Sequence, residues 1–141
     1  MVVSLIVPNC FNKEAQDFNY GKPYTKEVED LFITYIKDTH VDGACILGGE
    51  PFQQDLDMLL NLVKRIKEET NKPIYVWTGY LWDILIKDSK KLEILKYVDI
   101  VIDGKFEEDK KDLTLKHKGS SNQREIDVAL SLKEGKVVEI K

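Results

Sequence analysis

The sequence predicts an α/β protein with a mainly parallel sheet and flanking helices. Short apolar segments alternate along the chain with longer amphipathic segments, and three of the apolar segments end at a glycine beside a polar or charged residue. Alternation at this spacing is typical of right-handed βαβ crossovers, which place the strands parallel. The 141 residues suit one domain, 1–141, with a sizeable core.

Two strands and two helices are predicted in the first half of the chain. Residues 2–7 form the first strand, and residues 43–47, an apolar segment next to glycines, form a second strand buried on both faces. Apolar residues recur every three or four positions in 25–37 and 54–69, which predicts an amphipathic helix in each. Residues 10–23 have no clean period and are interpreted as a loop, which could include a helical turn at 13–18.

The second half continues the alternation. Its predicted elements are a strand at 74–77, a helical stretch at 81–97, a strand at 98–102, a charged surface segment at 107–118, a short element at 126–130 and a terminal strand at 137–140. The helical stretch is interrupted near Asp88, and Ser89 is a candidate cap for its second part. Residues 126–130 fit a short helix or a strand, so this element stays open.

Composition excludes several classes of function. The net charge of −4 argues against general nucleic-acid binding, which usually requires a basic face. No apolar run approaches the roughly 20 residues of a membrane span, and the first residues lack the basic start of a secretory signal. We therefore expect a cytoplasmic protein without a membrane partner. The two cysteines, Cys10 and Cys45, are too few for a disulfide framework, and Cys45 is interpreted as a small core residue.

Three predicted strand ends supply a candidate site. Parallel strands end at one edge of the sheet, where α/β proteins bind ligands. The residues at these ends are Gly48, Gly49, Glu50, Pro51, Thr78, Gly79, Asp103, Gly104 and Lys105. A zwitterionic ligand such as an amino acid would suit Glu50 for its ammonium and Lys105 for its carboxylate. Two plainer interpretations stay open: residues 48–51 are only a strand-to-helix turn, or Asp103 and Lys105 pair with each other at the surface.

Six motifs carry a resemblance to a known family. They are residues 10–15 (CFNKEA), 17–21 (DFNYG), 47–52 (LGGEPF), 76–80 (VWTGY), 101–106 (VIDGKF) and 119–124 (GSSNQR). In this order they cover almost the whole chain, which resembles the activating proteins of anaerobic ribonucleotide reductases, small radical S-adenosylmethionine (SAM) enzymes. The resemblance implies a shortened, open radical-SAM-type partial (β/α) barrel.

The resemblance also implies a reaction and a set of ligand contacts. In the family, SAM sits on a [4Fe-4S] cluster and is cleaved reductively, and the resulting radical abstracts hydrogen from a glycine of the reductase large subunit. The cofactor-binding residues that it implies here are Gly48, Gly49, Glu50 and Pro51 for the methionyl amino group, with Thr78, Asp103 and Lys105 near the SAM site. Asn122 and Arg124 could face the ligand or the reductase.

The chain departs from the family at the cluster ligands. The family uses a Cys-x3-Cys-x2-Cys loop, and Cys10 matches its third cysteine, whereas Val3 and Val7 stand at the other two positions. The family also usually has a further strand before residues 2–7. Iron–sulfur clusters are held by several thiolates, so we expect Cys10 to be a remnant ligand and the chain, as written, to be inactive in glycyl-radical activation. The alternatives are a non-catalytic SAM-binding or reductase-docking module and an engineered cluster-deleted scaffold.

Overall fold

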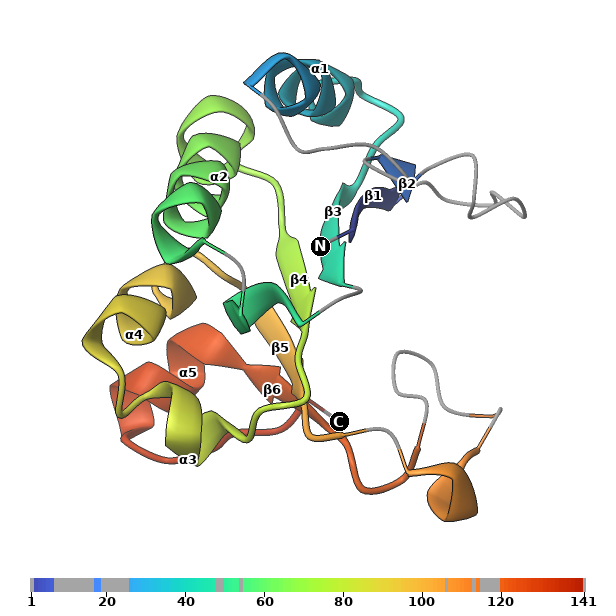
Figure 1. Cartoon of the computed structure of the whole chain (residues 1–141), viewed down its shortest axis with the longest axis vertical. Coiled ribbons are helices and arrows are strands. Elements are labelled where there is room, and N and C mark those ends of the chain that lie inside the picture. The colour runs from blue at the N-terminus through green and yellow to red at the C-terminus, as the bar shows by residue number, and fades with distance from the viewer. Residues whose placement is uncertain are drawn as a thin grey trace.

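The computed structural model describes residues 2–6, 17–18, 26–47, 50–53, 55–105, 107–112, 114 and 120–140. Its described strands form one six-stranded sheet in the order β2-β1-β3-β4-β5-β6 (Figure 1). The strands are β1 (Val2–Ile6), β2 (Asp17–Phe18), β3 (Gly43–Leu47), β4 (Ile74–Trp77), β5 (Ile100–Asp103) and β6 (Arg124–Asp127). The α/β class is confirmed.

Strand direction differs between the centre and the ends of the sheet. The central strands β3, β4 and β5 are parallel, as predicted, whereas β6 is antiparallel to β5. The parallel direction expected for the first strand is wrong, because β1 is antiparallel to both β2 and β3. A helical turn reaching residues 17–18 is also wrong, since Asp17 and Phe18 pair with β1. An apolar segment has the same pattern in either direction, so its composition carries no directional signal.

Helices lie along one side of the central strands. They are α1 (Lys26–Ile36), α2 (Leu56–Thr70), α3 (Trp82–Leu85), α4 (Ser89–Leu95) and α5 (Val128–Glu134), with 3-10 turns η2 (Pro51–Gln53) and η3 (Glu108–Lys110). Figure 1 shows α2, α4 and α5 to the left of β4, β5 and β6. The Asp55 carboxylate accepts hydrogen bonds from the first turn of α2, so the helix begins there. None of the described helices is long and apolar enough to cross a membrane.

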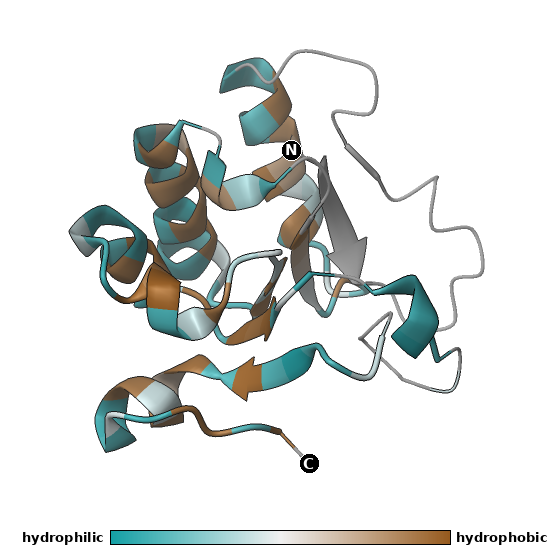
Figure 2. Cartoon of the chain, turned by 60° about the horizontal axis from the view of Figure 1, so that its bottom comes forward, coloured by the Kyte–Doolittle hydropathy of each residue, from teal (hydrophilic) through white to brown (hydrophobic). Residues whose placement is uncertain are grey.

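The core lies between the sheet and these helices. Alternate strand residues point into it and are fully buried, as period-two patterning requires. They are Ala44, Ile46, Ile74, Val76, Val101 and Ile126, and they pack with Leu59, Leu62, Val63 and Ile66 of α2. The helices in Figure 2 alternate hydrophilic and hydrophobic residues along their length, as expected for helices with one buried side. Cys45 is half-buried in β3, although the sequence suggested a core residue.

Three local predictions in the second half need correction. The cap of α4 is Asp88, whose carboxylate accepts from the Lys90 and Lys91 N–H groups, and Ser89 is the first helical residue. The open element at 126–130 is both a strand and a helix, because β6 ends at Asp127 and its carboxylate caps α5. The expected terminal strand is reduced to one antiparallel bridge, between Ile126 and Glu139.

Candidate ligand site at the carboxyl edge of the sheet

Glu50 joins the ends of β3 and β4. It lies between β3 and η2, and its Oε1 accepts a 2.6 Å hydrogen bond from the Gly79 N–H. Its Oε2 accepts from the Thr78 hydroxyl at 2.7 Å and from the Phe52 N–H at 3.1 Å. Two backbone donors and one hydroxyl therefore fix the orientation of this carboxylate, and hydrogen bonds to an ionised acceptor are among the stronger ones in proteins.

The loop after β4 is held from several directions. The buried Thr78 hydroxyl accepts from the Tyr80 N–H at 3.1 Å, while the Thr78 N–H donates to the Ile102 carbonyl at 3.0 Å. The Tyr80 hydroxyl accepts from the Gln53 amide at 3.2 Å, and the Lys91 ammonium lies 4.5 Å from the centre of the Tyr80 ring. This side of the site is thus built by protein contacts alone.

Asp103 is fully buried and bonded to protein groups. Its exposed fraction is 0%, and it pairs with Arg124 through contacts of 3.0 Å from Nε and 2.6 Å from Nη2. The Trp82 N–H also donates to it at 2.9 Å. Hydrogen bonding to Asp103 raises the pKa of Arg124. The alternative in which Asp103 pairs with Lys105 is not what the structure shows, because Arg124 is the ion-pair partner of Asp103.

The side chains of Glu50 and Lys105 approach the same position beside Gly79. A Cβ atom added to Gly79 would lie 3.4 Å from Lys105 Cγ and 3.5 Å from Glu50 Oε1. Lys105 is exposed, and within the described part of the chain no carboxylate forms an ion pair with its ammonium. A fixed carboxylate and the stem of an exposed lysine therefore meet beside a glycine.

The structure brings together part of the predicted residue set. Glu50, Thr78 and Lys105 meet around Gly79, while Pro51 is buried in η2 directly after Glu50. Gly48, Gly49 and Cys10 lie outside the described residues. Among the residues that are described, no group of three or more potential metal ligands occurs.

Two residues that support the site were not predicted from the sequence, and the role of a third was left undecided. Gln53 and Tyr80 were not expected to contact each other, because their side chains come from different βα connections. The role of Arg124 was open, although its position opposite Asp103 in the β5–β6 register explains it. An antiparallel pairing of β5 with residues 124–127 was the missing signal.

Comparisons with known proteins show the family of the chain. Residues 5–126 match the model of a family described as a 4Fe-4S single cluster domain. The chain therefore belongs to the family that carries this description. No solved structure matches it at a significant level.

Relatives give the family its narrower name. Proteins named anaerobic ribonucleoside-triphosphate reductase-activating protein match at 41% identity in Pasteurella multocida and 39% in Escherichia coli. These matches cover 81% and 82% of this chain and 75% and 77% of the two relatives. A protein of the same name from enterobacteria phage T4 is 34% identical over 82% of this chain and 72% of its own length. The chain belongs to the family of anaerobic ribonucleoside-triphosphate reductase-activating proteins, which confirms the resemblance.

Proposed function

We propose that this chain binds SAM at the carboxyl edge of its parallel strands, as a SAM-binding member of the activating-protein family. The observation that carries the proposal is that Glu50 Oε1 and the Cγ of the exposed Lys105 both approach the open Cβ position of Gly79. The methionyl part of SAM ends in an ammonium and a carboxylate, so two protein charges of opposite sign complement it. Glycine at this position keeps the space beside the backbone open.

Each side chain has a distinct part in this proposal. Glu50 receives the ammonium, and its bonds to Gly79 and Thr78 reduce the reorganisation that binding would otherwise require. Lys105 receives the carboxylate. Gly48, Gly49 and Pro51 are the other residues that we propose to serve the methionyl amino group. Asp103 is near the site but acts indirectly, because it is buried against Arg124 and the Trp82 N–H.

We further propose that residues 1–141 form one radical-SAM-like domain, a shortened open (β/α) barrel. Parallel β3, β4 and β5 with helices on one side support this architecture. The buried apolar residues also form one contiguous cluster, from Phe32 in α1 to Val128 in α5. The large subunit of an anaerobic ribonucleotide reductase is the proposed partner, in the cytoplasm, because the relatives are named as activators of that reductase.

The cysteines of this chain do not fit a [4Fe-4S] cluster held by its own thiolates. The sequence contains two cysteines, and one of them, Cys45, is half-buried within β3. Clusters of this type are commonly held by four cysteine thiolates, or by three where SAM occupies one iron. We infer that Cys10 is a remnant ligand and that the chain as written does not carry out reductive cleavage. Bound SAM would supply the radical chemistry of the family once a cluster reduced it.

Anaerobic reconstitution tests this proposal. The chain is incubated with iron, sulfide and reductant, followed by iron counting and an assay for 5′-deoxyadenosine, with SAM binding measured by calorimetry in parallel. We expect SAM binding without a stoichiometric cluster and without 5′-deoxyadenosine. Stoichiometric cluster formation with SAM cleavage would overturn the inferred inactivity, and absence of SAM binding would overturn the proposed site.

A further inference from the structure

Three consecutive residues contact three others in reverse order. The Arg124 guanidinium binds the Asp103 carboxylate, the Gln123 amide donates to the Gly104 carbonyl at 2.9 Å, and the Asn122 amide donates to the Lys105 carbonyl at 2.8 Å. The register of β5 and β6 ends at Asp103 and Arg124. Side chains therefore continue, beyond the end of the sheet, the antiparallel pairing that backbone groups make within it.

Ser120 sets the orientation of the two amides. Its hydroxyl donates to Asn122 Oδ1 at 2.6 Å, and its N–H donates to Gln123 Oε1 at 3.2 Å. Ser120 is fully buried, and its hydroxyl in turn accepts from the Glu107 N–H at 3.2 Å. With both amide oxygens occupied, the NH₂ groups point to the carbonyls of Gly104 and Lys105, because an amide donates only from its nitrogen.

Gly104 is held on two sides. Its N–H donates to the Tyr80 carbonyl at 3.2 Å, while its own carbonyl accepts from Gln123. Its φ of +92° is a conformation that L side chains rarely adopt, and a Cβ there would lie 3.8 Å from the Asn122 carbonyl oxygen. The turn that carries Lys105 is thus fixed between the loop after β4 and residues 122–124.

We propose that Asn122, Gln123 and Arg124 are positioning residues for Lys105. They fix the backbone of residues 103–105, and so they determine that the Lys105 stem passes beside Gly79, at the position that Glu50 Oε1 also approaches. None of the three contacts the ligand. Their effect is on recognition of the ligand carboxylate, an inference that rests on the proposed SAM site.

Binding of two ligands tests this role. SAM and decarboxylated SAM both carry the amino group, but the latter lacks the carboxylate that Lys105 would bind. We expect the parent to bind SAM about tenfold more tightly, the order of one charged hydrogen bond, and Lys105→Met to abolish the preference. Asn122→Ala should lower the preference at least about threefold while leaving affinity for decarboxylated SAM unchanged.

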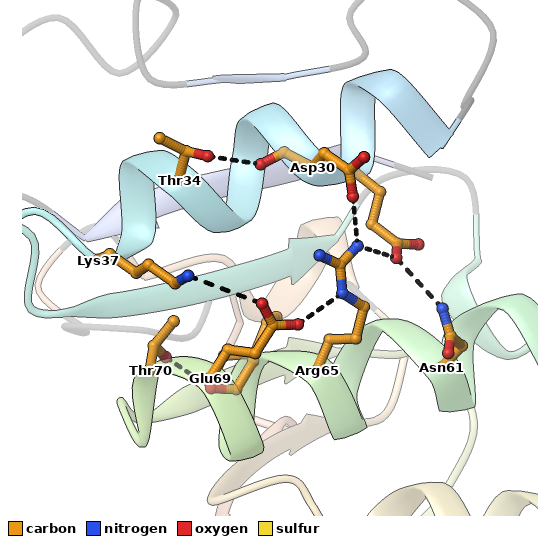
Figure 3. Close-up of polar contacts among 9 residues, drawn as sticks. Asp30, Thr34, Lys37, Asn61, Arg65, Glu69 and Thr70 are labelled. Carbon is orange, nitrogen blue, oxygen red and sulfur yellow. Dashed lines mark hydrogen bonds and ion pairs between the residues drawn. The ribbon is translucent and has the colours of Figure 1, made fainter.

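The matched control is Asn61→Ala. It removes an amide that donates to Glu29 at 3.2 Å, between α1 and α2 (Figure 3), and should leave the preference as in the parent. An unchanged preference in Asn122→Ala would overturn the positioning role. Equal loss of affinity for both ligands would overturn it too, because a general loss of structure does not distinguish the carboxylate.

A second measurement does not depend on SAM. Hydrogen exchange of the Gly104 amide reports how firmly the turn is held, and we expect exchange about tenfold faster in Asn122→Ala than in the parent or Asn61→Ala. Unchanged exchange would overturn the positioning role by itself. If the parent fails to bind SAM while Asn122→Ala accelerates this exchange, the proposed function is wrong. The inference that Asn122 fixes the backbone of residues 103–105 is then still supported.

Discussion

Two arginine networks in this chain have different consequences. Between α1 and α2, Arg65 Nη1 contacts Glu29 at 2.6 Å and Asp30 at 2.8 Å, and its Nε contacts Glu69 at 2.7 Å (Figure 3). At the sheet edge, Arg124 contacts Asp103 alone among the carboxylates of the described residues. The α1–α2 network therefore contains more charged groups than the pair at the sheet edge.

The two networks differ in the groups that their carboxylates bind. Glu29 and Glu69 contact the side chains of Asn61, Arg65 and Lys37, which lie on α2 or directly after α1. Asp103 and Glu50, in contrast, accept from backbone N–H groups: those of Trp82 at the start of α3, of Gly79 after β4, and of Phe52 in η2. Charge density alone therefore does not mark a ligand site. Carboxylates that fix loop backbone beside an exposed lysine are the better indicator.

The largest expected effect is a loss of stability on breaking the ion pair between Arg124 and Asp103, here called the edge pair. Arg124→Met leaves the Asp103 carboxylate fully buried without its cation, and loss of one partner of such a pair costs about 3–5 kcal/mol of unfolding free energy. Urea unfolding of the variant and of Lys133→Met, an exposed control in the last turn of α5, measures the difference. A change below about 1 kcal/mol, the range of surface pairs, would show that the edge pair is not structural.

A smaller loss is expected from the α1–α2 network. Arg65→Met removes the cation beside Glu29, whose side chain is 7% exposed where that of Asp103 is 0%, while the two arginines are similarly exposed, at 25% and 29%. Glu29 also keeps the Asn61 amide as a donor. We expect a loss of about 2 kcal/mol in unfolding free energy, between the values for surface and buried pairs. SAM affinity should be unchanged in calorimetry. Weakened SAM binding in this variant would contradict the claim that the sheet edge, and not the α1–α2 network, forms the ligand site.

Gly79→Ala separates the effect of the site on SAM binding from its effect on stability. The added Cβ meets Lys105 Cγ and Glu50 Oε1 at ordinary contact distances, so the fold should accept it within about 0.5 kcal/mol. It also fills the space beside Glu50 Oε1 and the Lys105 stem, which the proposed ligand would occupy, so SAM affinity should fall about tenfold. Thermal unfolding and calorimetry on the same sample separate the two effects. Full SAM affinity would place the ligand elsewhere.

The smallest effect is a pH dependence of the α1–α2 network. Hydrogen bonding from Arg65 lowers the pKa of Glu69 below its ordinary value. A lowered pKa in the folded state stabilises the protein above the unfolded-state value of about 4.3, and this stabilisation is lost as the pH falls through the folded-state pKa. The stability difference between the parent and Arg65→Met should therefore narrow below about pH 4. A constant difference between pH 7 and pH 3 would contradict this.

Much of the fold could be predicted from local pattern. The bounds of β3 and β4 agree with the predicted segments, because glycine and proline bound these short apolar runs. The expected burial of residues 43–47 on both faces is wrong, since Cys45 is only half-buried. The α2 helix agrees within about two residues at its start for the same kind of reason, a strong apolar stripe. The direction of β1 could not be predicted, since pairing direction depends on partners distant in the sequence.

The candidate site was predictable in its location more than in its contacts. The convergence of Glu50 with Thr78 follows from parallel strands ending at one edge. The partner of Asp103 was missed because Arg124 belongs to a strand whose register with β5 leaves no local trace in the sequence. Contacts within one strand-to-helix connection can be predicted from the local sequence pattern. Contacts between two such connections can be predicted only when the strand order and pairing are known.

Calorimetric titration of SAM into the parent and into Glu50→Gln tests the central claim most directly. The variant keeps the size of the side chain and removes the charge that we propose to bind the ligand ammonium, and urea unfolding verifies that it stays folded. We expect SAM affinity to fall about tenfold or more in the variant, since a hydrogen bond to a charged group contributes about 1.5–3 kcal/mol. Equal affinities in the two proteins would contradict the account.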